Sequence, residues 1–483
     1  MKILKYSFSI LLGAMLFTSC QKDKLNPSSQ TSIPAEGAFA SAARIQSQVN
    51  GLYANLKSGS YMGGRYAIFS DVRGENFINN TGNAVTASTV WNFTVTGSDS
   101  YLNNMWNSAY NTINQVNLFL DGMQKQGDSL VSATLAKQYH GEAKFVRAVA
   151  YYGLLQLFVP PYTSGSTQKA LPLRLTPITT VGYSNLARST IADVYTQILA
   201  DLNDAENLLP LTYPDATSNT IHAHRNTVVA FKTRVYLSMG NYPSVITEAN
   251  KIVSATAPFS APTGVANALQ SNIAAVFATP YTTTESMFSL PFTGVNEAPG
   301  TQNQLAYYYL PSSGLATAGN GEYYLNATGI IGDAGWKTTD ARRGFVKTVS
   351  AKQWLTKYSV GSPYTDWIPV LRYAEVLLNL AEARTRSTNT IDAQAIALLN
   401  AVRGRSDAST VFTAANFTGP ADLINAILKE RNIELLGEGM RSSDIMRLGL
   451  TFPAKGSASA VGPTDLGYVF PNPTSETQYN SLW

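Results

Sequence analysis

The chain has 483 residues, of which 45% are hydrophobic and only 14% are charged, against about 25% charged in a typical globular protein. Its 35 Lys and Arg residues and 31 Asp and Glu residues give a net charge of +4 and are scattered rather than clustered. This composition predicts a globular protein with a large hydrophobic core, and it argues against a binding surface for nucleic acid or a polybasic contact with lipid.

The first 20 residues have the pattern of an export signal that ends in a lipid attachment site. Two lysines precede an apolar run from 6 to 17, and two small residues come before Cys20, the only cysteine of the chain. The run is shorter than the roughly 20 apolar residues that a membrane-spanning helix needs. Residues 16–20, Leu-Phe-Thr-Ser-Cys, resemble a bacterial lipobox, in which the cysteine is lipidated and becomes the new N-terminus. An ordinary secretory signal with a chance cysteine is the alternative.

We therefore expect residues 1–19 to be a lipoprotein signal peptide and Cys20 to carry the lipid. Residues 20–37 are polar and have no hydrophobic period, which predicts a tether. The remaining residues, 38–483, are expected to form a single domain. Because no second cysteine exists, no disulfide stabilises this domain, and hydrophobic burial must do so instead.

Helical periodicity dominates the predicted domain. Apolar residues recur at the spacing of one helix face in three long segments, 39–56, 101–123 and 135–158. Pro160 and Pro161 stop the third helix because neither residue has an amide hydrogen. Ser189 or Thr190 is a favourable N-cap for the next helix, which is expected to run to Leu208.

Later helices are expected in pairs. The predicted helices are 228–239 with 243–253, 369–383 with 391–403, and a last one over 421–437. Gly240 permits the left-handed turn that ends a helix, and Pro243 suits the first turn of the next. Small and aromatic residues between 230 and 249 look like a degenerate tetratricopeptide repeat. We predict a mostly α fold, a tetratricopeptide-like helical-repeat scaffold of about four helix pairs.

Two long excursions with few helical periods interrupt this scaffold, at about 60–100 and 256–368. Both are rich in Thr, Gly and aromatic residues. A short strand-like run at 287–292 predicts a small β element. Long ordered loops tend to carry function, so we expect both excursions to face the ligand.

Patterns for catalysis or metal binding are weak. His222-Ala-His224 has the spacing of half a metal site, but no third ligand with matching spacing follows, so loop histidines are expected. The sequence has no His-Glu-x-x-His, no Gly-x-Ser-x-Gly and no phosphate-binding glycine motif. We predict no catalytic residue, no metal and no cofactor. A secreted glycoside hydrolase stays open as an alternative, because its two carboxylates are paired in space and not in sequence.

Several ordered motifs resemble the SusD/RagB family. Residues 141–152, Gly-Glu-Ala-Lys-Phe-Val-Arg-Ala-Val-Ala-Tyr-Tyr, are similar to its signature helix, and the charged run from Ile427 to Gly449 is the most specific match. The resemblance covers nearly the whole mature chain. The other matches are Trp106-x3-Tyr110-x2-Ile113-x3-Asn117, Arg234-Val235-Tyr236-Leu237, Asp340-Ala341-Arg342, Arg372-Tyr373-Ala374-Glu375-Val376-Leu377-Leu378 and Leu399-Asn400-x2-Arg403.

The resemblance implies a lipoprotein on the outer face of the outer membrane that captures oligosaccharides or other nutrients. Members of the family sit as a lid over a TonB-dependent transporter of the SusC type, and their mostly α fold has four tetratricopeptide-like units around a variable region that holds the ligand. For this chain it implies a SusC-like transporter, a glycan and the outer membrane as partners, with no nucleic acid and no enzymatic activity. A peptide-binding member of the family is the alternative.

In the first excursion, the resemblance and the chemistry of sugars point to four side chains. Sugar recognition needs flat aromatic faces for the ring and amides, carboxylates or guanidinium groups for the hydroxyls. Trp91 lies where the family commonly places a ligand aromatic, and a core tryptophan is the alternative. Asp71, Arg73 and Asn76, together with Glu75, form a polar cluster on a loop that family members often turn toward the ligand. A solvated turn is the alternative for this cluster.

In the second excursion, the candidates for ligand contact are aromatic. They are Tyr308, Tyr323 and Trp336, with Trp354 and Trp367 as weaker choices. Consecutive tyrosines cannot all face one way, so one from each run is expected to reach the ligand. Core or dimer contacts are the alternative for most of them.

The charged residues of the family motifs are interpreted as ion pairs and caps between packed helices rather than as an active site. They are Glu142, Arg147, Arg372, Glu375, Glu430, Arg431, Glu434, Arg441, Asp444 and Arg447.

Overall fold

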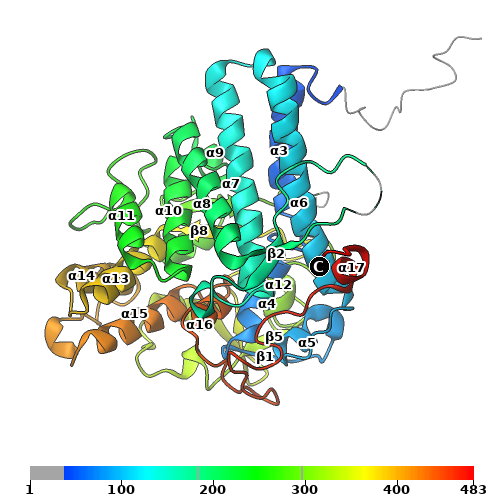
Figure 1. The fold of residues 1–483 in the computed structure, drawn as a ribbon. Helices are drawn as coiled ribbons and strands as arrows, with labels where there is room; N and C mark the ends of the chain where they lie inside the picture. The colour runs from blue at the N-terminus through cyan, green and yellow to red at the C-terminus, as the bar shows by residue number, and fades with distance from the viewer. Residues whose placement is uncertain (1–36, 181, 183, 295–296) are drawn as a thin grey trace, which may run out of the picture.

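A computed structural model of the chain describes residues 37–180, 182, 184–294 and 297–483 (Figure 1). The predicted signal peptide 1–19, the lipidation site Cys20 and all but the last residue of the tether 20–37 lie outside these residues. In the part of the chain that the structure describes, no helix is both long enough and apolar enough to cross a membrane.

Long upright helices form the N-terminal part of the scaffold (Figure 1). They are α3 (Ala42–Leu56), α6 (Ser100–Lys125), α7 (Ala133–Phe158) and α8 (Ile191–Leu208). Helix α3 packs on α6, α6 on α7 and α7 on α8. The capping prediction is confirmed for α8, because Thr190 and Asp193 form a reciprocal capping box at its start.

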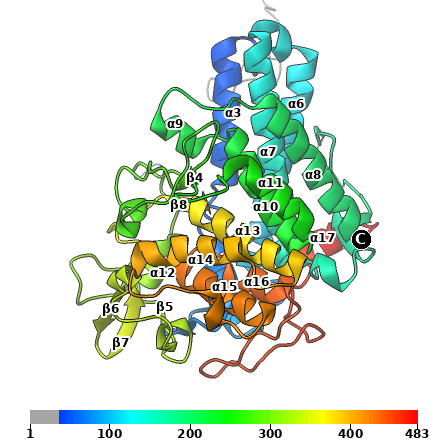
Figure 2. The same cartoon turned by 90° about the vertical axis from the view of Figure 1, so that its left-hand side faces the viewer.

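The C-terminal half continues the scaffold with helices joined in pairs (Figure 2). They are α10 (Arg225–Ser238), α11 (Tyr242–Ile252), α13 (Tyr373–Thr388), α14 (Ala393–Ser406) and α15 (Pro420–Glu434). Gly240 has a φ of 70° in the turn between α10 and α11, as the helix-ending prediction requires. Helix α13 packs on both α11 and α15. The prediction of a mostly α, tetratricopeptide-like scaffold is confirmed.

One predicted helix begins later than expected. Residues 369–372 belong to strand β8 (Ile368–Arg372), which pairs antiparallel with β4 (Ser286–Leu290), and α13 starts only at Tyr373. Pro369 has no amide hydrogen to donate in a helix, and β4 supplies a neighbouring strand that lies about 80 residues away in the sequence. The predicted strand-like run at 287–292 is confirmed as most of β4.

The remaining elements are short and lie mostly in the excursions and connections. The antiparallel strand pairs are β1 (Phe77–Asn79) with β5 (Tyr323–Leu325), β2 (Lys169–Pro172) with β3 (Arg188–Thr190), and β6 (Val346–Val349) with β7 (Lys352–Leu355). The short helices are α4 (Arg65–Arg73), α5 (Ser88–Trp91), α9 (Ala216–Ile221), α12 (Leu305–Tyr309), α16 (Arg441–Arg447) and α17 (Thr474–Tyr479).

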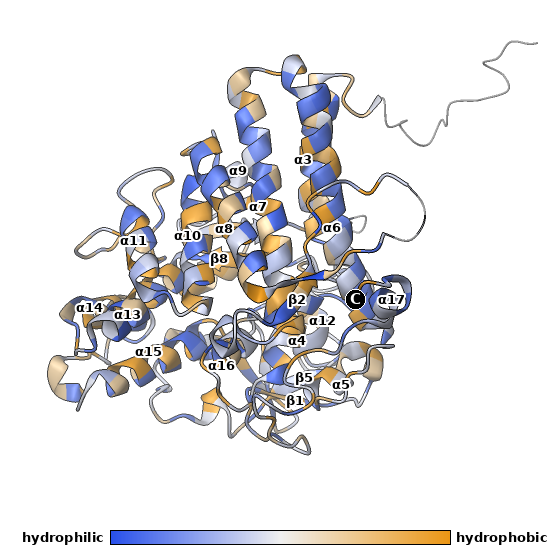
Figure 3. Ribbon diagram, in the orientation of Figure 1, coloured by the Kyte–Doolittle hydropathy of each residue, from blue (hydrophilic) through white to orange (hydrophobic). Residues whose placement is uncertain are grey.

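A hydrophobic core joins the scaffold to the excursions. Hydrophobic and hydrophilic residues alternate along the helices, as the hydropathy colouring shows (Figure 3), and the hydrophobic ones form one buried cluster. The same buried cluster includes Trp106 of α6, Leu377 of α13 and Tyr309 of the second excursion. The excursions are therefore packed parts of the domain and not peripheral loops.

Candidate ligand-binding site

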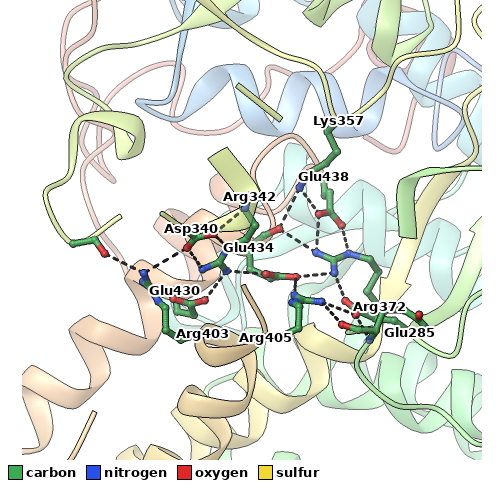
Figure 4. Close-up of polar contacts among 12 residues, drawn as sticks. Glu285, Asp340, Arg342, Lys357, Arg372, Arg403, Arg405, Glu430, Glu434 and Glu438 are labelled. Atoms are coloured by element: carbon green, nitrogen blue, oxygen red, sulfur yellow. Dashed lines mark hydrogen bonds and ion pairs between the residues drawn. The ribbon is translucent and has the colours of Figure 1, made fainter. Parts of the chain in front are cut away.

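A buried cluster of ten charged side chains lies where the second excursion meets helices α14 and α15 (Figure 4). We call it the charge cluster. Each of these side chains is at most 5% exposed. Five carboxylates face five cations, so the cluster is neutral. Its members are Glu285, Asp340, Glu430, Glu434, Glu438, Arg342, Lys357, Arg372, Arg403 and Arg405.

Glu434 is at the centre of the charge cluster. Its two carboxylate oxygens accept from Arg342 at 2.8 Å, Arg372 at 2.9 Å and Arg405 at 2.5 Å. Burial alone would raise the pKa of Glu434, but these three guanidinium groups hold it well below its usual value. The three guanidinium groups therefore favour the ionised carboxylate, and both of its oxygens accept hydrogen bonds within the protein.

The charge cluster connects segments that are far apart in the sequence. Arg342 of the excursion binds Asp340 and also Glu430 of α15, while Arg372 of β8 binds Glu438 and Glu285. Other motif charges form similar buried pairs elsewhere in the scaffold, namely Arg147–Asp201, Arg234–Glu375, Arg431–Asp444 and Arg447–Glu382. The interpretation of these motif residues as packing ion pairs is confirmed.

The predicted polar cluster in the first excursion is also buried, which corrects the expectation that it faces ligand. Asp71 and Arg73 lie in α4 and not on a loop. The Asp71 carboxylate accepts from the amide of Gly439 at 2.9 Å. Arg73 donates to the Gly467 carbonyl at 2.9 Å and lies 4.5 Å from the centre of the Phe452 ring.

Asn76 has the same structural role. Its side chain donates to Asn432 of α15 at 2.6 Å and accepts from the amide of Ile330 at 3.0 Å. The sequence neighbours of these polar residues suggested a solvated turn or a binding loop. Their actual partners are hundreds of residues away, and they join the first excursion to the C-terminal helices.

The four predicted aromatic side chains are buried as well, which corrects the expectation that they contact ligand. Trp91 is 6% exposed, and its indole donates to the Phe77 carbonyl at 2.8 Å. Tyr308 and Tyr323 stack with their ring planes 9° apart. Trp336 is 2% exposed and lies beneath the guanidinium of Arg343. The core alternative holds for all four.

The two excursions meet at a surface that we call the excursion junction, made of residues 79–86, 320–324 and Lys352. Strand β1 pairs with β5 so that Asn79 is opposite Tyr323. The ladder continues past the strands, where the Asn80 amide donates to the Glu322 carbonyl at 2.8 Å. The Asn80 side chain donates to the Gly321 carbonyl at 2.7 Å and accepts from Lys352 at 2.5 Å.

A buried carboxylate holds the junction from below. Glu322 is fully buried and accepts from Thr86 at 2.6 Å, and also from Thr81 and Asn320. Two of the predicted aromatics support the same surface, since Tyr323 donates to the Thr86 carbonyl at 2.9 Å and Trp91 to the carbonyl of β1 residue Phe77. The segment 79–86 is therefore held in place by the protein itself and does not need a ligand to order it.

The outer face of the junction has the groups that sugar binding needs. Asn80, Thr81 and Asn320 are exposed, and Tyr324 and Lys352 are half-buried. The Lys352 ammonium lies 4.9 Å from the centre of the Tyr324 ring. Amides, a hydroxyl, an ammonium and an aromatic ring thus share one surface.

Sequence reasoning chose the wrong member of one tyrosine pair. Successive residues of a strand point to opposite faces, so Tyr323 turns inward while Tyr324 turns outward. The alternation of side chains along this strand can be read from the sequence, but which face of the strand is buried depends on its pairing with β1. The polar run from Asn79 to Thr86 was the other available signal.

The two histidines that resemble half a metal site do not meet. The His222 imidazole is 2.8 Å from a carboxylate oxygen of Glu142, while His224 is fully buried. Among the described residues, no group of three or more His, Cys, Asp or Glu side chains is arranged to hold a metal ion.

Family models cover nearly all of the chain. The model described as "SusD family" matches residues 232–481, and the model described as "Starch-binding associating with outer membrane" matches residues 23–237.

Solved structures and a curated relative agree with this match. A SusD superfamily protein from Bacteroides fragilis is 33% identical, with a TM-score of 0.82 over 92% of this chain and 99% of the other. "SusD-like protein P2" from Formosa agariphila is 24% identical over 92% of this chain and 91% of its own length. A "Laminarin binding SusD-like protein" shares the fold, with a TM-score of 0.70 and 20% identity over 91% of this chain and 98% of the other.

Removing one cation from the charge cluster should destabilise the whole protein. Arg372→Ala leaves Glu285, Glu434 and Glu438 short of a partner, and breaking a buried pair costs about 3–5 kcal/mol. The matched control is Lys125→Ala at the exposed pair with Asp121, where the expected loss is below about 0.5 kcal/mol. Urea denaturation measures both, and equal losses would contradict the assigned role.

The buried Asp71 carboxyl should make stability depend on pH. Burial raises its pKa from 3.8 to about 7, so the folded state binds this proton more tightly than the unfolded state. Its contribution is complete below pH 4 and is lost as pH rises through 7, at about 1.4 kcal/mol per unit. Asp71→Asn does not titrate. The variant should therefore gain stability relative to wild type between pH 5 and pH 8 in denaturant titrations, and a constant difference would refute the assignment.

Proposed function

The chain belongs to the SusD family, and from that membership we propose that it is a cell-surface lipoprotein that binds oligosaccharides and passes them to a SusC-like TonB-dependent transporter in the outer membrane. In this proposal Cys20 holds the protein to the membrane by its lipid, and residues 20–37 keep the folded domain clear of the bilayer. The helical scaffold presents the excursions to the ligand and to the transporter.

The excursion junction is the observation that carries the assignment of a ligand surface. Both irregular segments of the domain contribute to it, and its exposed groups match the hydroxyls and the apolar face of a sugar. The only carboxylate among its residues is Glu322, which is buried and already accepts from three neighbours. Glycoside hydrolysis takes two carboxyl groups roughly 5–10 Å apart, so this surface supports binding without cleavage.

The chemistry of the junction favours a glycan held weakly. Tyr324 offers one aromatic ring, and such a contact adds on the order of 1 kcal/mol beyond area burial. The hydrogen-bonding groups exchange water for sugar hydroxyls at a small net gain. Affinity in the micromolar range, about 8 kcal/mol, is expected. The laminarin-binding relative with this fold supports a glycan over a peptide as the ligand class.

Shortening the exposed junction side chains should weaken glycan binding without unfolding the protein. Tyr324→Ala and Asn80→Ala each remove a contact of about 1.4 kcal/mol, which lowers affinity about tenfold. Isothermal titration with laminari-, malto-, xylo- and cellohexaose measures the change, and Lys125→Ala on α6 is the exposed control. Binding of unstructured peptides but of no glycan by the wild-type protein would overturn the sugar assignment.

Replacing the predicted lipidation site should release the protein from the membrane. Cys20→Ala removes the only thiol in the chain, so the cells should incorporate no labelled palmitate into the protein. The expected readout is loss of the protein from the outer-membrane fraction and loss of co-purification with the transporter. Labelling of the Cys20→Ala variant, or no labelling of the wild type, would contradict a lipid anchor at this residue.

A further inference from the structure

A second concave site lies away from the excursion junction, and we propose that it binds one end of a neutral oligosaccharide. We call it the α3–α9 cleft. It is lined by the C-terminal part of α3, by α9 and by the chain that leaves β4, and its volume is about 450 Å³. Small-molecule sites span roughly 300–1,000 Å³. Helices α9 and α3 lie well above β1 and β5 in Figure 1 and well above β5, β6 and β7 in Figure 2, so this cleft is separate from the junction.

Trp367 gives the cleft an aromatic wall. It immediately precedes β8, whose first residue, Ile368, is paired with Leu290 of β4, so the ladder begins at the residue next to Trp367. Its indole stacks on Tyr281 with ring planes 16° apart and centres 5.4 Å apart. The side chain is half-buried and lines the cleft. A ring held in this way offers a flat surface to the apolar face of a sugar at little entropic cost.

The other walls combine small apolar groups with hydrogen-bonding groups. Leu290, Pro291 and Ile221 cover apolar area. Asn50 of α3, Thr217 of α9 and Thr293 are exposed at the rim and can exchange hydrogen bonds with ligand hydroxyls.

One histidine in the cleft is held in a fixed orientation. Nδ1 of His222 is 2.8 Å from the buried Glu142 carboxylate, and the edge of its ring meets Tyr53 at 5.0 Å between centres. Its second nitrogen, Nε2, is on the opposite side of the ring from this contact. His222 is half-buried and lines the cleft, so its oriented ring forms part of the wall that a ligand would contact.

The charges of the cleft select a neutral ligand. Lys57 donates to the Pro291 carbonyl at 3.0 Å and lies 3.7 Å from Glu297, and His222 is matched by Glu142. Lys57 thus has an acidic neighbour, and among the described residues that line the cleft a uronic acid or sulfate would meet no unpaired lysine or arginine. A glycan end with hydroxyls and one apolar face fits this arrangement.

Two sites on one folded chain would change how polymers bind. The second contact of a single long glycan becomes intramolecular, so a chain that reaches both sites binds more tightly than either site alone. A short oligosaccharide can occupy only one site at a time. The cleft therefore shares with the proposed function the premise that the ligand is a glycan, but it does not depend on the junction being a site.

Tryptophan fluorescence tests the cleft separately from the junction. Trp91, Trp106, Trp336 and Trp354 are buried and the half-buried Trp483 packs against Trp106, whereas Trp367 faces the cleft. The probes are laminari-, malto-, xylo- and cellohexaose, titrated into a Tyr324→Ala protein whose junction is impaired. We expect a saturable change with at least one hexaose. Trp367→Phe keeps an aromatic ring, so its affinity measured by calorimetry should stay within about threefold of the parent while most of the fluorescence change is lost. Trp367→Ala removes the ring and should lower the affinity at least tenfold.

A second variant, at an exposed position, shows whether a loss of binding is caused by blocking the cleft rather than by misfolding. Ala54 of α3 is exposed and lines the cleft, so Ala54→Arg fills the space without disturbing the core. It should abolish the titration in the Tyr324→Ala background while leaving thermal unfolding unchanged. Unchanged titration in both Trp367→Ala and Ala54→Arg, no saturation with any hexaose, or saturation only with a peptide would overturn the cleft assignment. If the Tyr324→Ala substitution by itself abolishes all hexaose binding, the cleft is refuted and the junction is supported as the glycan site.

Discussion

The architecture of this protein depends on the mutual pairing of ten charged side chains that are buried away from water. Each charge in the cluster around Glu434 would be costly to bury alone, and the structure compensates by placing five carboxylates against five cations with short hydrogen bonds. Because the partners come from the second excursion, β8, α14, α15 and the segment just after α15, the cost is offset only when all of these segments are in place. Charge pairing thus adds a directional constraint on the position of the excursion to the apolar contacts of the shared core.

The exposed surfaces follow from this constraint. With one excursion fixed to α14 and α15 and the other joined to the C-terminal helices through Asp71, Arg73 and Asn76, β1 and β5 are brought together. The buried Glu322 then orders the loop above them. On another side of the scaffold, the β4–β8 ladder positions Trp367 at the α3–α9 cleft. Both surfaces are preformed, which suits weak and reversible capture of sugars.

The sequence was informative where structure is local and misleading where it is not. Helix periods between 42 and 158 and the Thr190 cap depend on residues within a few positions of one another, and these predictions are confirmed. Asp71 was expected to face ligand because it lies in a polar cluster, and Trp91 because the family resemblance places a ligand aromatic there, yet their partners are Gly439 and Phe77. Which of Tyr323 and Tyr324 faces outward depends on pairing with β1, some 245 residues earlier.

The most direct test of this account measures whether the charge cluster holds the second excursion in place. Amide hydrogen exchange in wild type and Arg342→Met compares residues 340–357 with helices α6 and α7, which do not contribute to the cluster. The account predicts much faster exchange of amides such as those of Arg343 and Thr356 in the variant, with α6 and α7 unchanged. Equal protection of 340–357 in both proteins would contradict it.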